Sequence, residues 1–293
     1  MSGDGTLVSK LKQMVKRALR YPEPPPAPPP APPPVLGIDL FYWRPKDGRH
    51  NFGDHLSMAI VTKMAAERSL FLDEIVPTPR RLLAIGSVLH FASDGDVIWG
   101  SGFNGSISVD QHKYRTLDVR SVRGPLTRDF LERRGIMAPA IYGDPALLIK
   151  RLLGERFPLP QQRLPVAYVP NFADLDHMQG WENVVSPYLP WSEVIRRIIG
   201  AEHVISSSLH GLIIADAFGI PCTYLRLSET EGMFKYEDYV LGAGRDKLDV
   251  RTSQSEAVKA SPMLPIKFNT DRLYGAFPWD LWAPCDAASP SSL

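Results

Sequence analysis

The sequence predicts an α/β protein with two lobes, each containing a parallel β-sheet. From Val35 onward, short runs rich in β-branched residues alternate with segments whose apolar residues recur at helical spacing. Such alternation is typical of βαβ units. The chain has 293 residues, which is enough for roughly two domains. We therefore expect one lobe over 35–145, a second over 146–285, and a disordered tail at 286–293.

Each predicted element follows from its local pattern. The segment 54–68 carries Leu56, Ile60 and Met64 on one helical face, and Pro125 suits the first position of a helix. Strands are expected at 35–43, 81–86, 96–100, 116–122, 140–144, 164–170, 203–206 and 221–227. Helices are expected at 54–68, 125–134, 191–200 and 209–219. Because ligands of parallel sheets bind beyond the carboxyl ends of the strands, polar residues that follow strands are the site candidates.

The first 34 residues differ from the rest of the chain. Apolar residues between 7 and 20 recur at helical spacing, and lysines and arginines occupy most of the remaining face. Two interpretations stay open: a basic amphipathic helix on an anionic membrane surface, or a solvated or packing helix. From Pro22 to Pro34, ten of thirteen residues are proline, which predicts an extended polyproline II spacer of ~40 Å.

Composition excludes several classes of protein. The net charge of +1 gives no basic face for nucleic acid. Two cysteines make neither a disulfide framework nor a zinc site, and the histidines are too scattered for a metal. No segment has the ~18–20 consecutive apolar residues of a membrane span, and no secretory signal is seen. We expect a cytoplasmic protein without metal or cofactor, in peripheral contact with the inner membrane face if the N-terminal helix binds there.

The most informative stretch is HVISSSLHGLIIADAFGIP, from His203 to Pro221. Ser207 and Ser208 fall where a strand ends, and His210 falls in the first turn of the following helix. Hydroxyls and free backbone N–H groups at a helix N-terminus bind anions, and a histidine there can exchange a proton with the bound group. The alternative is that the serines cap the helix and the histidine packs in the core.

Other strand ends carry polar residues of the same kind. Asn51, Gly53 and Asp54 precede a helix, where plain capping is the alternative. His90 and Ser101 stand in or beside glycine-rich loops, which are permissive turns as well as ligand cradles.

Charged residues add donors for an anion. Arg120 and Arg123 precede a helix and can bind an anion bidentately, with surface salt bridges as the alternative. Asp144 lies in a turn between glycine and proline, and Lys235 lies in a predicted late loop. From the residues alone, the chain is predicted to be an α/β enzyme acting on a small anionic donor.

Six motifs in one order identify a family resemblance. NFGDHLS, GSVLHFASDGDVIWGSGFNG, LDVRSVRGPLTRDFLERRGI, YGDPALL, VISSSLHGLIIADAFGIP and FKYEDY occur between about Phe41 and Trp282. Together they resemble the polysaccharide pyruvyl transferases, especially the branch that includes the xanthan ketal pyruvate transferase.

The resemblance implies a fold and a reaction. The fold is related to the GT-B glycosyltransferases, with two Rossmann-like lobes facing a cleft. The donor is phosphoenolpyruvate, and the acceptor is a sugar of a lipid-linked exopolysaccharide repeat unit. Pyruvate becomes a cyclic ketal across two sugar hydroxyls, and phosphate is released. No cofactor is implied.

The resemblance also implies residue roles. Arg123 and His210 contact the donor, and Asp54 lies near the acceptor. We hypothesise that His210 is the general acid and that Asp54 is a base or orienter for a hydroxyl. The residues expected to bind the acceptor or line the cleft are Asn51, Gly53, His90, Ser101 and Asp144.

The sequence departs from the family pattern at Ser208, where many members carry arginine. Lys235 or Arg120 can replace the missing cation, or the serines and the helix N-terminus can suffice. Two alternative functions stay open: a GT-B-type glycosyltransferase that uses a nucleotide sugar, with Glu229 as the nearest acidic candidate for a ribose, and a non-catalytic subunit of polysaccharide assembly.

Overall fold

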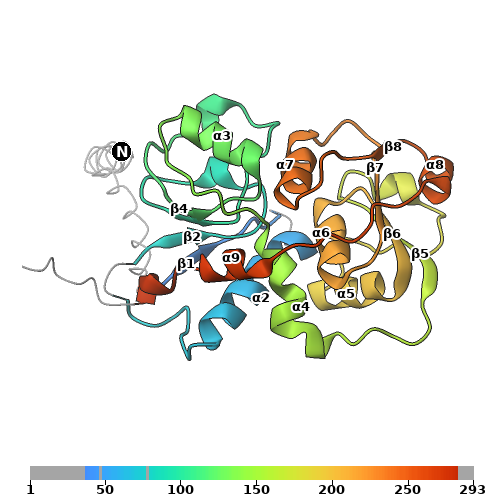
Figure 1. Cartoon of the computed structure of the whole chain (residues 1–293), viewed down its shortest axis with the longest axis horizontal. Coiled ribbons are helices and arrows are strands. Elements are labelled where there is room, and N and C mark those ends of the chain that lie inside the picture. Colours follow the sequence, from blue (N-terminus) through green and yellow to red (C-terminus); the bar gives the residue numbers. More distant parts are fainter. Residues whose placement is uncertain (1–36, 46–47, 77–78, 283–293) are drawn as a thin grey trace, which may run out of the picture. The chain divides into compact units, whose positions relative to one another are not determined.

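The computed structural model describes residues 37–45, 48–76 and 79–282, and these contain two four-stranded parallel sheets (Figure 1). The first sheet comprises β1 (Asp39–Phe41), β2 (Arg81–Leu83), β3 (Val97–Trp99) and β4 (Asp118–Ser121). The second comprises β5 (Leu164–Val169), β6 (Ala201–Ser206), β7 (Cys222–Leu225) and β8 (Val250–Arg251). The predicted α/β fold with two parallel sheets is confirmed.

In each sheet the strands lie in chain order. Neither sheet of the described residues therefore contains an internal reversal of strand order, the position at which a single open sheet usually binds its ligand. A ligand site must instead be built where the carboxyl ends of the two sheets meet.

The four predicted helices are confirmed, and four further helices of the described residues were not predicted. The α-helices are α2 (Phe52–Ala66), α3 (Pro125–Arg133), α4 (Ile149–Leu153), α5 (Trp191–Ile199), α6 (Leu209–Phe218), α7 (Phe234–Gly242), α8 (Gln254–Lys259) and α9 (Thr270–Gly275). Short 3-10 helices are η1 (Leu89–Phe91), η2 (Val109–Gln111), η3 (Pro145–Leu148), η4 (Gly154–Arg156), η5 (Asp176–Met178) and η6 (Trp279–Trp282).

Helix α6 lies at the centre of the second lobe. It contacts α5, β6 and β7 on one side and η3 and α4 on the other. Its apolar residues surround the helix axis, and Leu212, Ile213 and Ile214 are all fully buried, as expected for a helix enclosed by protein. Gly219 ends it in the left-handed conformation with φ 75°. The buried body of α6 fixes the position of its N-terminal turn.

Two predicted local structures are wrong. The segment 140–144 is not a strand, because only one isolated bridge joins Val122 and Tyr142 before Asp144 caps η3. The predicted late loop around Lys235 is helix α7.

The C-terminal segment returns to the first sheet. The indole Nε1 of Trp99 in β3 donates to the carbonyl of Leu273 in α9 at 2.9 Å, and Phe277 packs against the Trp99 ring at 4.8 Å. Nε1 of Trp282 donates to the carbonyl of Phe71 at 2.8 Å. One apolar cluster consequently includes buried residues from both sheets.

A buried ion pair joins the lobes at α3 and α7, which pack together (Figure 1). Nε of Arg123 lies 3.0 Å from Oδ2 of Asp238, and both side chains are fully buried. Asp238 also accepts hydrogen bonds from the backbone N–H and the hydroxyl of Thr127. Gly124 permits this contact, because a Cβ there would lie 1.8 Å from the Asp238 carbonyl oxygen.

None of the helices in the described ranges is long and apolar enough to cross a membrane. The predicted basic helix, the proline-rich spacer and the predicted tail at 286–293 lie outside the described residues.

Replacing Asp238 with asparagine is expected to lower the free energy of unfolding by about 3–5 kcal/mol, because Arg123 would stay buried without its counter-charge. Urea unfolding measures the change. The matched control is Asp280→Asn, since Asp280 pairs with Arg120 but its side chain is 57% exposed; there we expect ~1 kcal/mol or less. Equal losses in the two variants would contradict a special role for the buried pair.

Candidate active site

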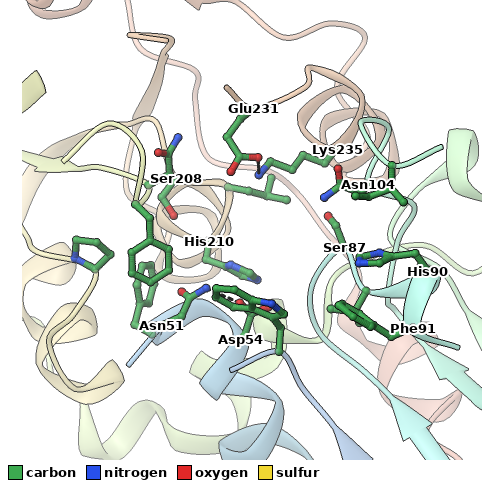
Figure 2. A pocket seen from close by; sticks show the side chains of 18 residues that line it. Asn51, Asp54, Ser87, His90, Phe91, Asn104, Ser208, His210, Glu231 and Lys235 are labelled. Atoms are coloured by element: carbon green, nitrogen blue, oxygen red, sulfur yellow. Dashed lines mark hydrogen bonds and ion pairs between the residues drawn. The ribbon is translucent and has the colours of Figure 1, made fainter. Parts of the chain in front are cut away.

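A pocket of about 310 Å³ opens at the carboxyl ends of both sheets. Residues that follow β1, β2, β3, β5 and β6 line it, so both lobes contribute. The lining residues that the sequence predicted are Asn51, Asp54, His90, Ser208, His210 and Lys235. The others are Trp43, Phe52, Ser87, Val88, Phe91, Asn104, Ile107, Asn171, Phe172, Pro187, Leu209 and Glu231. Figure 2 shows His210 beside Asp54 and the Lys235–Glu231 pair on another wall.

His210 packs against the first turn of α2. A Cβ on Gly53 would lie 2.0 Å from His210 Nδ1, so only glycine allows the ring to occupy this position. The Phe52 ring meets the imidazole edge-to-face at 6.2 Å. The side chain of His210 is 12% exposed, and it reaches the pocket from the second lobe while the first lobe supports it. Gly53 therefore positions His210 and does not itself line the pocket.

Asp144 lies behind His210. Its Oδ2 is 3.9 Å from His210 Nε2, which is longer than a hydrogen bond, and neither atom has a hydrogen-bond partner among the described residues. Its Oδ1 accepts from the Ala146 N–H at 2.9 Å and caps η3. Asp144 is fully buried, so it faces the ring and not the pocket.

Burial shifts the pKa of both partners in opposite directions. It raises the pKa of Asp144 to about 7, against the stabilising Ala146 N–H and the positive charge of Arg123. It lowers the pKa of His210 to about 3, and the charges of Lys235 and Arg123 lower it further. In each case burial disfavours the charged form. At neutral pH the ring is therefore neutral, and burial favours the protonated form of the carboxyl group.

Asp54 is the carboxyl group that lines the pocket beside His210. Asn51 caps α2 through its Oδ1 and donates from Nδ2 to Asp54 Oδ2. Gly86, at φ 102°, leaves room for Asp54 Oδ1, which a Cβ would approach to 2.6 Å. Burial raises the pKa of Asp54 to about 7, with Lys235 lowering it and Asp144 raising it. Asp54 is therefore poised to gain or lose a proton near neutral pH.

Lys235 supplies positive charge from the first turn of α7. Within the described part of the chain, it is the only lysine or arginine that lines this pocket. Its Nζ forms an ion pair with Oε2 of Glu231, which also lines the pocket. Glu229, the acidic candidate for binding a ribose, has a side chain that is 93% exposed and lies outside the lining residues.

Only the last of the three serines faces the pocket. Ser208 is the N-cap residue of α6, and its side chain makes no capping hydrogen bond. Ser207 is 1% exposed; its Oγ accepts from the Asn171 N–H, and its carbonyl accepts from the Tyr236 hydroxyl. Ser206 Oγ lies 2.8 Å from the Val169 carbonyl oxygen. Ser206 and Ser207 therefore make contacts within the protein, and the predicted donor contact of Ser207 stays a prediction.

Arg123 does not reach the pocket in this structure. Besides Asp238, its guanidinium donates to Ser87 Oγ at 2.6 Å and to the Phe103 carbonyl at 2.7 Å. With no exposed surface, it meets the pocket only through Ser87, which lines it. Arg123 is therefore not among the lining residues, and the donor contact that the resemblance implies stays a prediction.

Two further predicted residues lie away from the pocket lining. Arg120 pairs with Asp118 at 2.6 Å and with Asp280 at 2.7 Å. These are the salt bridges that the sequence analysis gave as the alternative to anion binding. Ser101 is fully buried, and its Oγ donates to the Gly86 carbonyl at 3.0 Å. Both therefore have partners within the described residues, and neither lines the pocket.

His90 lines the pocket from η1, and its ring centroid lies 4.0 Å from that of Phe91 with the rings tilted by 41°. The lining residues that the sequence analysis missed include Ser87, Asn104 and Asn171. All three follow strands, so the strand-end rule would have found them if applied to every loop. Glu231 carried no such local signal.

Comparison with known proteins supports the predicted family. A protein-family profile described as Polysaccharide pyruvyl transferase matches residues 51–229. The chain is 28% identical over 217 residues to the Succinoglycan biosynthesis protein ExoV of Rhizobium meliloti (strain 1021). That alignment covers 70% of this chain and 64% of the relative, slightly less than two thirds of the relative's length.

A solved structure described as a functional uncharacterized protein, KP1_0663 from Klebsiella pneumoniae subsp. pneumoniae NTUH-K2044, aligns with a TM-score of 0.44 and 15% identity. The alignment covers 85% of this chain and 99% of the solved chain. The family match alone extends over more than half of the sequence and includes Asp54, Asp144 and His210. The chain therefore belongs to the polysaccharide pyruvyl transferase family.

Proposed function

We propose that the protein transfers the enolpyruvyl group of phosphoenolpyruvate to two hydroxyls of one sugar in a lipid-linked exopolysaccharide repeat unit. The product is a cyclic pyruvate ketal, and phosphate is released. Family membership supports pyruvyl transfer, and the name of the relative from Rhizobium meliloti supports an exopolysaccharide acceptor. The two parallel sheets, with a pocket at their carboxyl ends, are compatible with a GT-B-like arrangement.

The observation that carries this proposal is the juxtaposition of His210 and Asp54 in one pocket, with Asp144 behind the ring. Ketal formation needs a proton delivered to C3 of the enol and protons removed from two hydroxyls. The imidazole of His210 and the carboxyl group of Asp54, whose pKa is about 7, are the groups for these two tasks.

With His210 as the acid and Asp54 as the base, every proton in the reaction has a donor and an acceptor. A proton adds to C3 of the donor, and the first sugar oxygen bonds to C2 while its proton passes to a base. The bond between C2 and the phosphate oxygen then breaks. The second hydroxyl bonds to C2, and its proton leaves with the phosphate. No electrons are exchanged, so no redox cofactor takes part in this scheme.

His210 acts as the acid only after the donor binds. In the free protein its pKa of about 3 leaves the ring neutral at pH 7. A phosphate and a carboxylate beside the ring add negative charge, which raises its pKa and favours the protonated form. Asp144 then stabilises the imidazolium from behind, so we propose that Asp144 is a positioning residue.

The donor anion has two sources of stabilisation in this scheme. The N-terminal turn of α6, which Ser208 begins, offers backbone N–H groups and the positive end of the helix dipole. Lys235 adds an ammonium group from α7. Together they take the place of the arginine that many family members carry at the Ser208 position. A cytoplasmic location at the inner membrane face follows from a lipid-linked acceptor and is part of the proposal.

The first test is acceptor-dependent release of phosphate from phosphoenolpyruvate, with lipid-linked oligosaccharide as acceptor. His210→Gln is expected to reduce kcat by about 10²–10⁴-fold, because it removes the acid. His203→Gln is the control, since His203 pairs with Thr223 in the sheet and lies outside the pocket lining. Full activity of His210→Gln, or phosphate release without an acceptor, would show that the proposed chemistry is wrong.

The pH profile tests Asp54 as the base. Because the ionised carboxylate accepts the proton, kcat/KM is expected to rise with pH and level off above the raised pKa of about 7. Asp54→Asn is expected to lower the rate, and the ratio of wild-type to variant kcat/KM should rise with pH up to about 7, because the ionisation of the donor cancels in this ratio. A ratio that stays constant between about pH 5.5 and 8.5 would rule out this assignment.

Glu231 is expected to weaken donor binding, because its carboxylate competes with the anionic donor for Lys235. Glu231→Gln should lower the KM for phosphoenolpyruvate about fivefold, equivalent to ~1 kcal/mol. Glu229→Gln is the matched control, with the same change in the same loop but outside the pocket lining. A KM that falls equally in both variants would indicate a general charge effect instead of this ion pair.

A further inference from the structure

The mouth of the pocket carries aromatic side chains that the donor chemistry does not use. Trp43 follows β1 in the first lobe, and Phe172 follows β5 in the second. Their rings meet edge-to-face at 6.3 Å. Phe172 in turn packs on Tyr188 at 5.0 Å. These three rings, Trp43, Phe172 and Tyr188, form an aromatic wall that extends across both lobes.

Arg49 holds one ring of the aromatic wall, Tyr188, in place. The guanidinium of Arg49 lies 4.6 Å above the Tyr188 ring, and its Nη1 donates to the Tyr188 hydroxyl at 2.5 Å. A cation over one ring face and a hydrogen bond to its hydroxyl restrict the ring to one orientation. The aromatic surface is therefore organised before a ligand binds, which reduces the entropy lost on binding.

The aromatic rings at the pocket keep solvent-exposed surface. Trp43 is 36% exposed, and Phe91, which lines the pocket from the first lobe, is 39% exposed. By contrast, Trp99 in the core is fully buried. Exposed aromatic surface gathered at the rim of a polar pocket is typical of a ligand-binding site.

We infer that the aromatic wall is the acceptor subsite and that it stacks the pyranose ring of the sugar that receives pyruvate. This inference deepens the proposed function and depends on it for the identity of the acceptor. One face of a pyranose presents C–H groups, which pack on aromatic rings, while its hydroxyls need polar partners. Asn104 and Asn171 supply amides in the same lining.

The position of the wall favours a sugar over a nucleotide. Trp43 lies in the connection from β1 to α2, and Asp54, the proposed base, lies in the first turn of α2; both line the pocket. A nucleotide diphosphate would need cations beside the wall. Lys235, the only lining lysine or arginine of the described residues, is the cation that the proposed donor uses, so no lining lysine or arginine is left for a second phosphorylated ligand.

Direct binding without donor tests the inference. Saturation-transfer NMR with cellobiose and with lactose, whose terminal sugars carry free O4 and O6 hydroxyls, is expected to show transfer from the protein to the ring protons. Trp43→Ala should weaken this binding about tenfold, which corresponds to ~1.4 kcal/mol, and Trp43→Phe should keep most of it. Phe71→Ala is the control, because Phe71 is 58% exposed but lies outside the pocket lining.

Kinetics with the full acceptor give an independent readout. Trp43→Ala and Phe172→Ala should each raise the acceptor KM about tenfold while the KM for phosphoenolpyruvate changes less than about twofold. If Trp43→Ala does not fold, Phe172→Ala carries the test.

The inference is overturned if neither disaccharide binds, if Phe71→Ala loses as much affinity as Trp43→Ala, or if UDP and not a disaccharide shows Trp43-dependent binding. If sugar binding depends on Trp43 but phosphoenolpyruvate releases no phosphate, the acceptor subsite stands and the proposed donor is wrong.

Discussion

The imidazole of His210 lies directly against the backbone of Gly53, and the arrangement of the pocket depends on this contact. His210 belongs to α6 of the second lobe, and Gly53 begins α2 of the first. Any side chain at position 53 would occupy the space of the ring. The contact therefore holds the two lobes at the separation that brings Asp54 and Asp144 to the same imidazole. The buried Arg123–Asp238 pair secures the opposite seam, between α3 and α7.

Burial of the three titratable groups sets their chemistry in the free protein. Desolvation raises the pKa of Asp54 and Asp144 and lowers that of His210, because in every case it disfavours the charged form. In the free protein the ring is therefore neutral at neutral pH, and both carboxyl groups titrate near neutrality. An anion bound beside the ring would raise the pKa of His210 and favour its protonated form. The same pocket can then hold a neutral ring before binding and an acid during the reaction, without a change of fold.

The fold was predictable where local pattern and final environment agree. Alternation of β-branched runs with helical periodicity placed β1 to β7 and the helices α2, α3, α5 and α6. It missed α7, although Tyr236, Tyr239 and Val240 have helical spacing and are buried, because charged residues between them obscure the pattern. It also placed a strand at 140–144, where the turn at Gly143, with φ 127°, leads into η3 instead. Sequence pattern could not show that α9 returns to Trp99, because that contact joins residues 174 positions apart.

By itself, the sequence determined the fold class, the strand-end location of the site, and His210, Asp54, Asn51, Ser208, His90 and Lys235 as residues that line it, because strand ends and helix starts are local features. Only the tertiary structure decided which polar side chains face the pocket and which are used in packing. Arg123, Arg120, Ser101 and Ser207 have the same residue types as ligand-binding groups, yet each is taken by a partner within the protein. Those partners come from other segments of the chain, so the choice between ligand contact and internal contact depends on three-dimensional packing.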